Sequence, residues 1–180
     1  FAMIVGVMGT ALISPLYALY QETWHLEASD ISLIYVIYMG GALFGLLFLG
    51  RLPDRLGFHP MMKLGLALAL LGTAISLAAW DMTSLNIGRF IVGVASSLIT
   101  TSSTQGLARL SRHGNAQHVA MMTGFLMALG FGLGPLVGGI FGQWAPAPLV
   151  SAYLPSLFLG SLGLAALFSL KLPDSAKPPA

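Results

Sequence analysis

Arg89 is the residue whose chemistry most needs an explanation. It stands inside a run that is otherwise uncharged, 85–108. A guanidinium group stays protonated at physiological pH, so it can bind a carbonyl, a carboxylate or water but cannot carry a proton on and off. Placing it inside an apolar helix is costly unless it meets such a partner. Arg89 is therefore a candidate functional residue, with a structural tie near the outer membrane surface as the alternative.

Two polar stripes are expected on helical faces, given 100° of rotation per residue. Arg89 shares a narrow face with Ser96, Thr100 and Ser103. The other stripe lies in the first apolar run and consists of Thr10, Ser14, Tyr17 and Gln21. Lipid does not favour polar side chains, so both stripes must face protein or water. We interpret them as the lining of a solute pathway, and hydrogen bonding between helices is the alternative.

A third pattern is a glycine repeat in the fifth apolar run. Gly130, Gly134 and Gly138 recur every four residues, with Pro135 among them. Glycine allows a neighbouring backbone to approach closely, and an internal proline removes a helix hydrogen bond. The pattern predicts a close helix-packing face that can also serve as a hinge.

Other kinds of chemistry find little support. The chain has no cysteine, so disulfides and thiolate metal sites are excluded. The four histidines fall in expected loops without metal-ligand spacing: His25, His59, His113 and His118. We find no nucleophile–base pair and no phosphate-binding loop, and a net charge of +2 without a basic run gives no sign of nucleic-acid binding. We therefore expect neither an enzyme nor a metal or cofactor site.

Apolar helices must position these residues. Hydrophobic residues make up 56% of the 180 residues, charged residues 8%, and the mean hydropathy is +0.84. About 20 apolar residues are needed to cross a bilayer. The sequence predicts an all-α, six-helix transmembrane bundle over residues 1–170, in contact with lipid. Its spans are expected at about 1–20, 31–50, 61–80, 85–107, 119–142 and 150–170, with Asp30 as the N-cap of the second.

The charges predict the orientation. Lysine and arginine stand in the connections after the second and fourth spans and in the tail, at Arg51, Arg55, Lys63, Arg109, Arg112, Lys171 and Lys177. The opposite connections carry Glu22, Glu27, Asp30 and Asp81 instead. Basic connections stay cytoplasmic, so both ends of the segment are expected on that side of a plasma (bacterial inner) membrane.

Three segments resemble one family of transporters. The major facilitator superfamily has a loop written G-x-L-x-D-R-x-G-R-[RK], which the segment Gly50-Arg51-Leu52-Pro53-Asp54-Arg55-Leu56-Gly57 resembles. The fourth-span motif of the same family resembles Arg89-x-x-x-Gly93. The fifth-span motif of its proton-coupled drug and metabolite exporters resembles Gly130-x-x-x-Gly134-Pro135-x-x-Gly138-Gly139. The resemblance implies one six-helix half, built as two inverted three-helix repeats, of a twelve-helix transporter.

The resemblance also implies a function. It indicates alternating access and proton-coupled export of a small amphipathic compound, with an importer of the same fold or a non-transporting membrane scaffold as alternatives. Gly50, Asp54, Arg55 and Gly57 would form a cytoplasmic gate loop, in which Asp54 faces a helix N-terminus of the missing C-terminal half. Residues 171–180 would begin the central linker. Met8, Tyr35, Tyr38, Phe125 and Met127 could add an adaptable apolar wall.

The sequence departs from the family pattern in the same loop. Phe58 and His59 stand where basic residues are usual, and no acid lies between Asp81 and Asp174. A charge relay between the loop and the inner end of the fourth span would therefore lack both of its ends. None of the six acids is expected inside a span, so the sequence places any proton-coupling carboxylate outside this segment.

Overall fold

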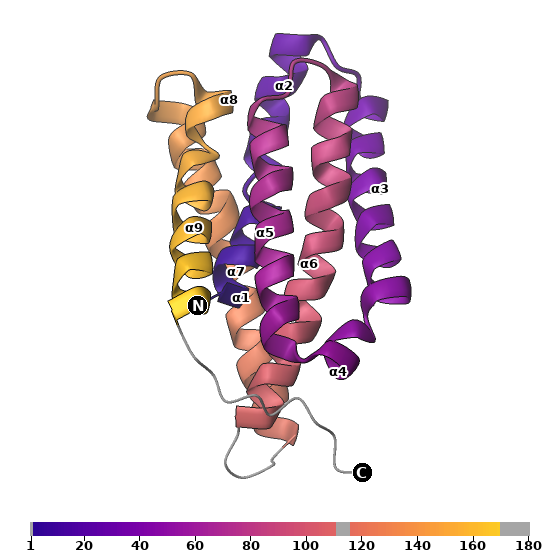
Figure 1. The fold of residues 1–180 in the computed structure, drawn as a ribbon. Coiled ribbons are helices and arrows are strands. Elements are labelled where there is room, and N and C mark those ends of the chain that lie inside the picture. The colour runs from indigo at the N-terminus through magenta and orange to yellow at the C-terminus, as the bar shows by residue number, and fades with distance from the viewer. Residues whose placement is uncertain (1, 111–115, 170–180) are drawn as a thin grey trace.

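The fold is an up-and-down bundle of long helices (Figure 1) in a computed structural model that describes residues 2–110 and 116–169. Its elements are α1 (Ala2–Ala11), the 3₁₀ turn η1 (Ser14–Leu16), α2 (Tyr17–Trp24), α3 (Ala28–Phe44), the π-helical segment η2 (Gly45–Leu49), α4 (Leu52–Leu56), α5 (Phe58–Leu77), α6 (Met82–Leu110), α7 (Ala116–Trp144), α8 (Pro148–Ser151) and α9 (Leu154–Ser169). The expected linker 171–180, Arg112, His113, Lys171, Lys177 and Asp174 lie outside the described residues.

Within the described residues, six helical stretches are long and apolar enough to cross a membrane. They are Ala2–Trp24, Ala28–Leu49, Phe58–Leu77, Met82–Arg109, Ala116–Trp144 and Pro148–Ser169. The all-α six-helix bundle expected from the sequence is therefore confirmed. Several stretches begin before the expected spans because polar and proline residues at their ends join the helix: the third begins at Phe58 and the sixth at Pro148.

The first span is interrupted, which the sequence analysis did not predict. Its α-helix ends at Ala11, and a 3₁₀ turn with Pro15 near its start leads into α2. Proline has no N–H and its ring crowds the preceding turn, so an uninterrupted α-helix is disfavoured here. The last carbonyls of α1 are then left without helical donors.

Acidic residues cap two of the helices at one end of the bundle. Glu27, and not Asp30, is the N-cap of α3: the Glu27 side chain accepts from the backbone at Asp30, whose own carboxylate accepts from Glu27 N at 2.9 Å. This reciprocal capping box starts the helix three residues earlier than expected. At α6, Asp81 Oδ1 accepts from Ser84 N at 2.8 Å, which satisfies a donor of the first turn. Hydrogen bonding from Ser84, first through its side chain and second through its backbone, lowers the pKa of Asp81.

Small residues allow close packing between the helices. A methyl group added at Gly93 of α6 would contact the backbone carbonyl of Tyr38 in α3, and one added at Gly41 of α3 would contact that of Phe90. The pairs α5–α6, α3–α6 and α1–α7 pack most extensively. Together they place α1 and α6 at the centre of the bundle, with α3 and α7 as its least buried spans.

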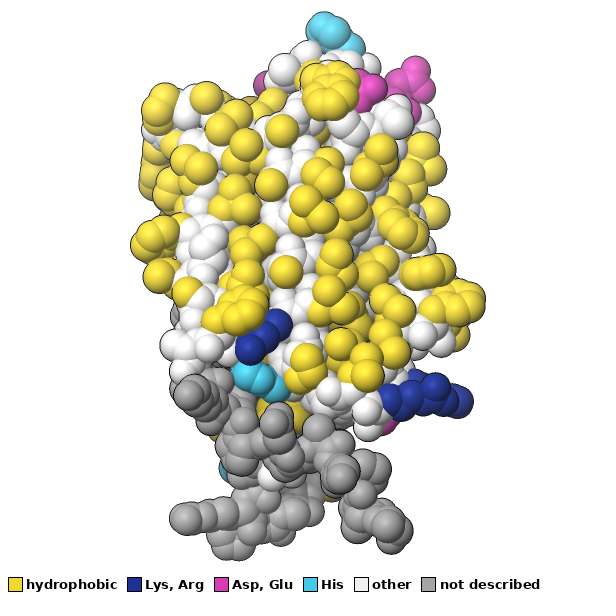
Figure 2. Space-filling model, in the orientation of Figure 1, with side chains coloured by type: hydrophobic (Ala, Val, Ile, Leu, Met, Phe, Trp, Pro, Cys, Tyr) yellow, Lys and Arg dark blue, Asp and Glu magenta, His cyan; other side chains and the backbone are white. Residues whose placement is uncertain are grey.

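The surface matches a lipid environment. Apolar side chains cover the middle of the visible face, while acidic groups gather at its upper end and basic groups at its lower end (Figure 2). The apolar side chains are large and numerous, and include Phe48, Phe125 and Phe168 at more than 60% exposure. A soluble protein would not tolerate so much exposed apolar area, whereas hydrocarbon accepts it.

Candidate functional site

The expected pathway residues do not form a single open wall. Thr10, Tyr17 and Arg89 lie inside the bundle, at 6%, 5% and 2% exposure. Ser14 is exposed, while Gln21, Ser96 and Thr100 are partly exposed. The structure thus separates an inner group around Arg89 from a more accessible group beside it.

Arg89 joins the middle of the bundle to the interrupted first span. Its Nη2 donates to the carbonyl of Thr10 at 3.1 Å, one of the carbonyls near the end of α1. Its guanidinium carbon lies 5.0 Å from the ring centroid of Tyr38, a cation–π distance. The carbonyl and the ring give the cation favourable partners in a desolvated position.

The polar atoms of the inner group are incompletely paired. Within the described residues, Arg89 Nε and the Tyr17 hydroxyl are buried without a hydrogen-bond partner. Tyr17 lies close to Arg89, whose charge acts on its hydroxyl group. Each such group costs free energy, so the arrangement has unused capacity to bind a polar atom.

The more accessible group links the first, second and fourth spans through hydroxyl groups. Two residues of this group, Ser14 and Ser96, contact Tyr35 and Tyr38 of α3. We call these four residues the tyrosine wall. Ser14 Oγ and Tyr35 OH lie 3.4 Å apart, and Tyr38 OH donates to Ser96 Oγ at 3.4 Å. Tyr35 is 41% exposed, and its ring centroid lies 4.8 Å from that of Tyr17.

The sequence analysis described these two tyrosines only as apolar surface. Their spacing of three residues on one helix puts them on a shared face, which was the available signal. The structure shows that their hydroxyl groups continue the polar stripes of the neighbouring helices. The tyrosine wall therefore offers both ring faces and hydrogen-bonding groups to a ligand.

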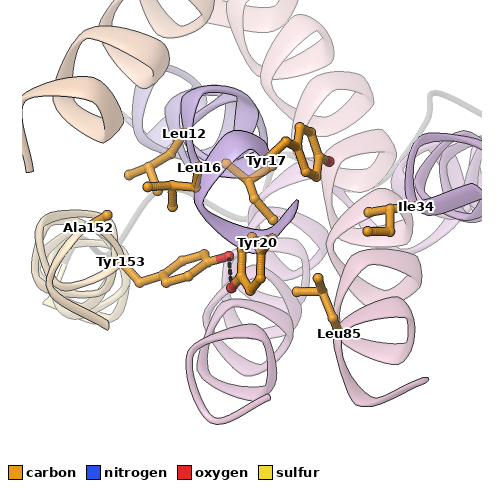
Figure 3. Close-up of a cluster of buried hydrophobic side chains, with 9 residues drawn as sticks. Leu12, Leu16, Tyr17, Tyr20, Ile34, Leu85, Ala152 and Tyr153 are labelled. Carbon is orange, nitrogen blue, oxygen red and sulfur yellow. Dashed lines mark hydrogen bonds between the residues drawn. The ribbon is translucent and has the colours of Figure 1, made fainter. Parts of the chain in front are cut away.

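A buried aromatic cluster lies at the acidic end of the bundle (Figure 3). The hydroxyl groups of Tyr20 and Tyr153 are 3.1 Å apart, and both side chains are 2% exposed. Leu12, Leu16 and Ala152 pack around them. This contact joins α2 to the turn between α8 and α9, so the segments of two interrupted spans at the acidic end of the bundle are held together.

The expected gate loop forms the short helix α4 and its two flanking glycines. Gly50 follows the π-helical segment, and Gly57 has a φ of 94°, which a residue with a side chain rarely adopts. Asp54 and Arg55 are both exposed. Asp54 Oδ1 accepts a hydrogen bond from Gln105 Nε2 of α6 at 2.8 Å, a partner that the sequence analysis missed.

The two residues that depart from the family pattern are both used in packing at this end. Phe58 is buried, and a methyl group added at Gly106 of α6 would lie 3.0 Å from its ring. His59 Nε2 lies 3.0 Å from the carbonyl oxygen of Leu167, near the end of α9. An apolar contact of Phe58 and a hydrogen bond of the His59 ring therefore occupy the positions where the family pattern has basic side chains.

The fifth-span glycines face the first span. A methyl group added at Gly130 would lie 2.7 Å from Val7 Cβ, and one at Gly134 would lie 2.7 Å from the Met8 carbonyl oxygen. At Gly138 it would contact the Leu12 carbonyl oxygen. Gly132 and Gly139 have nothing within 4 Å of such a group. The four-residue repeat is thus the face of α7 that packs on α1 and η1, with Pro135 partly exposed beside it.

Residues that could hold a metal are not grouped in the described part of the chain, where no cluster of three or more histidines or carboxylates occurs. The acids there, Glu22, Glu27, Asp30, Asp54 and Asp81, lie near helix ends. The candidate site is made of the aromatic rings and hydroxyl groups of the tyrosine wall, with the buried Arg89 guanidinium behind them.

Comparisons with known proteins give a consistent picture. A family profile described as "Major Facilitator Superfamily" matches residues 1–180. The "Multidrug efflux protein YfmO" of Bacillus subtilis (strain 168) is 26% identical over 143 residues, which cover 79% of this chain and 36% of that protein. The "Quinolone resistance protein NorA" of Staphylococcus aureus (strain Mu50 / ATCC 700699) is 26% identical over 167 residues, which cover 92% of this chain and 41% of that protein. The chain spans about two-fifths of the length of these curated relatives.

Proposed function

We propose that this chain, which belongs to the major facilitator superfamily, forms one half of a membrane transporter that moves a small solute by alternating access. The six apolar helices and the family membership support this role. The second half would supply the rest of the substrate pathway, and α3 and α7, the least buried spans, are the helices most available to meet it.

The finer proposal is export of an amphipathic compound, coupled to protons. Two relatives are named for multidrug efflux and quinolone resistance. The tyrosine wall supports it chemically, because ring faces bind apolar parts of a ligand while hydroxyl groups bind its polar atoms. The names of the relatives support the outward direction. The proposed proton coupling is supported only by the resemblance of the fifth-span motif to that of proton-coupled exporters.

Within this proposal, the inner group positions the wall. Arg89 is too buried to form an open surface, but it lies against Tyr38 and holds the end of α1. A change in the first span would thereby reach Tyr38 through Arg89. Thr10, Tyr17, Gln21 and Thr100 would complete the pathway in conformations that open this part of the bundle.

The gate loop and the glycine face would control access. Asp54 is exposed at the basic end, where it could cap a helix N-terminus of the other half; an anion there is stabilised by about 0.3–1 kcal/mol. Gly130, Gly134, Pro135 and Gly138 would let α7 pivot on the first span while keeping the seam closed.

Proton coupling would reside outside this segment. Coupling requires a group that titrates near neutral pH and meets each side in turn, as a desolvated carboxylate can. The acids of the described residues lie near helix ends, and a guanidinium group cannot carry a proton on and off. Neutralising each acid of this chain singly in the full-length protein should leave coupling intact.

The observation that carries the proposal is the tyrosine wall, an accessible polar and aromatic surface inside an otherwise apolar bundle. We would test it with Ser14→Cys in the full-length protein, labelled by a membrane-impermeant maleimide. Labelling should occur and should fall when an amphipathic substrate is added. Gly40→Cys is the matched control, because Gly40 is also exposed but lies about 140° around α3 from Tyr35. Equal labelling and equal protection at both positions would contradict the proposal.

A further inference from the structure

Gln105 lies where α6 passes the gate loop. Its Nε2 donates to Asp54 Oδ1 at 2.8 Å, although the two residues are 51 positions apart in the sequence. Its other amide atom, Oε1, is buried and has no partner in the described part of the chain. A buried acceptor without a partner is unfavourable, so the orientation of this amide is set by its bond to Asp54.

That orientation also depends on the charge of Asp54. An ionised carboxylate only accepts hydrogen bonds, so the amide must present its NH₂ group. With the amide reversed, two oxygens would face each other. The contact therefore requires a donor opposite Asp54 Oδ1, which the Gln105 NH₂ group supplies.

Two neighbouring features hold the loop against α6 at the same place. Phe58 packs over Gly106, the residue after Gln105, and Gly57 turns the chain between Asp54 and Phe58 through its positive φ. One side of Asp54 is thus tied to α6, while its side chain stays exposed. The bond from Gln105 uses Oδ1, which leaves Oδ2 able to accept from another donor.

Within the described residues, arginines, a lysine and a histidine lie on α4 and on the helices that pack against it. Arg51 precedes α4 and Arg55 lies within it, both exposed. On α5, His59 contacts Leu167 and Lys63 lies over the ring of Phe168. Arg109 is one turn beyond Gln105 on α6 and has a partner of its own.

We propose that Gln105 is a positioning residue for the Asp54 gate. Its amide ties the gate carboxylate to α6 and directs Oδ2 outward, so that movement of α6 carries Asp54 toward or away from the other half. Because the donor is an uncharged amide, the tie does not depend on protonation of the donor. The inference rests on the gate role given to Asp54 under the proposed function.

The test replaces the amide with a group that titrates. In the full-length transporter, Gln105→Glu would place two carboxylates at hydrogen-bond distance, a pair that holds together by sharing a proton. The initial transport rate, divided by the wild-type rate at each pH, should fall as the pH is raised, because the pair of carboxylates then loses its shared proton and repels. Gln105→Leu should lower the rate by a similar factor at every pH. The control is Gln143→Glu, the same change at an exposed position near the C-terminal end of α7. Its transport rate relative to the wild type should not change with pH.

A second readout does not need transport. In a double-mutant cycle on melting temperature, the combined variant of Asp54→Ala and Gln105→Leu should shift less than the sum of the two single variants. A flat pH ratio for Gln105→Glu, or additive melting shifts, would overturn the inference while wild-type transport stands. If the wild type carries no solute but the melting shifts are non-additive, the contact survives and the proposed function fails.

Discussion

Gly134 and Gly132 provide a matched pair that tests the packing of the fifth span on the first. At Gly134 an added methyl group would lie 2.7 Å from the Met8 carbonyl oxygen and 2.8 Å from Ala11 Cβ, atoms that cannot rotate away. At Gly132 nothing lies within 4 Å. Both residues belong to the interior of α7, so the gain in helix propensity on mutation to alanine is about 1 kcal/mol in each and cancels in the comparison.

The difference between the two alanine variants therefore measures overpacking. Forcing an extra methyl group into a closely packed seam costs about 1–3 kcal/mol. We expect the free energy of unfolding of Gly134→Ala to be lower than that of Gly132→Ala by about 1–3 kcal/mol. This difference corresponds to about 5- to 150-fold in the unfolding equilibrium constant. The assay is unfolding of the full-length protein from detergent micelles by added dodecyl sulfate, followed by circular dichroism. Equal stability of the two variants would refute the close contact between α7 and α1.

Three further predictions concern the polar contacts. Arg89→Ala should destabilise the protein by about 1–3 kcal/mol in the same assay, since a buried carbonyl loses its donor, and Arg89→Lys should lose less; equal losses would show that the charge contributes nothing. Tyr20→Phe and Tyr153→Phe should each cost about 0.5–1.5 kcal/mol, and the double variant should cost less than their sum; additive losses would mean that the hydroxyl groups do not interact. Asp81→Asn should lower the melting temperature above pH 4, and this effect should shrink as the pH falls. The reason is that folding lowers the pKa of Asp81 from 3.8, so its stabilisation requires the ionised form. A melting difference that does not change between pH 3 and 6 would argue against it.

The bundle could be predicted because its causes are local. Long uncharged runs and the positions of the charges are direct consequences of the bilayer as a solvent. Gly130, Gly134 and Gly138 fall on one helical face by periodicity alone. Helix ends were less certain, because capping depends on geometry: the sequence Glu27–Asp30 can start a helix at either acid, and the reciprocal bonds decide it.

The contacts between distant segments could not be predicted. Arg89 was recognisable as a costly residue, but its partner exists only because the first span is interrupted after Ala11. The hydroxyl contact of Tyr20 with Tyr153 joins residues 133 positions apart, and a single sequence carries no signal for it. The partnership of Asp54 with Gln105 was equally hidden, since a single glutamine near the end of a helix gives no indication of which loop it meets.

The most direct test of the central claim is solute flux by the full-length protein. Everted membrane vesicles containing it would be energised to acidify their interior, and uptake of a lipophilic fluorescent dye would be followed over time. We predict dye accumulation inside the vesicles that collapses on addition of a protonophore and is reduced by Gly134→Leu, with Gly132→Leu as the matched control. Accumulation no greater than in vesicles without the protein, across a panel of cationic, neutral and anionic dyes, would contradict the account.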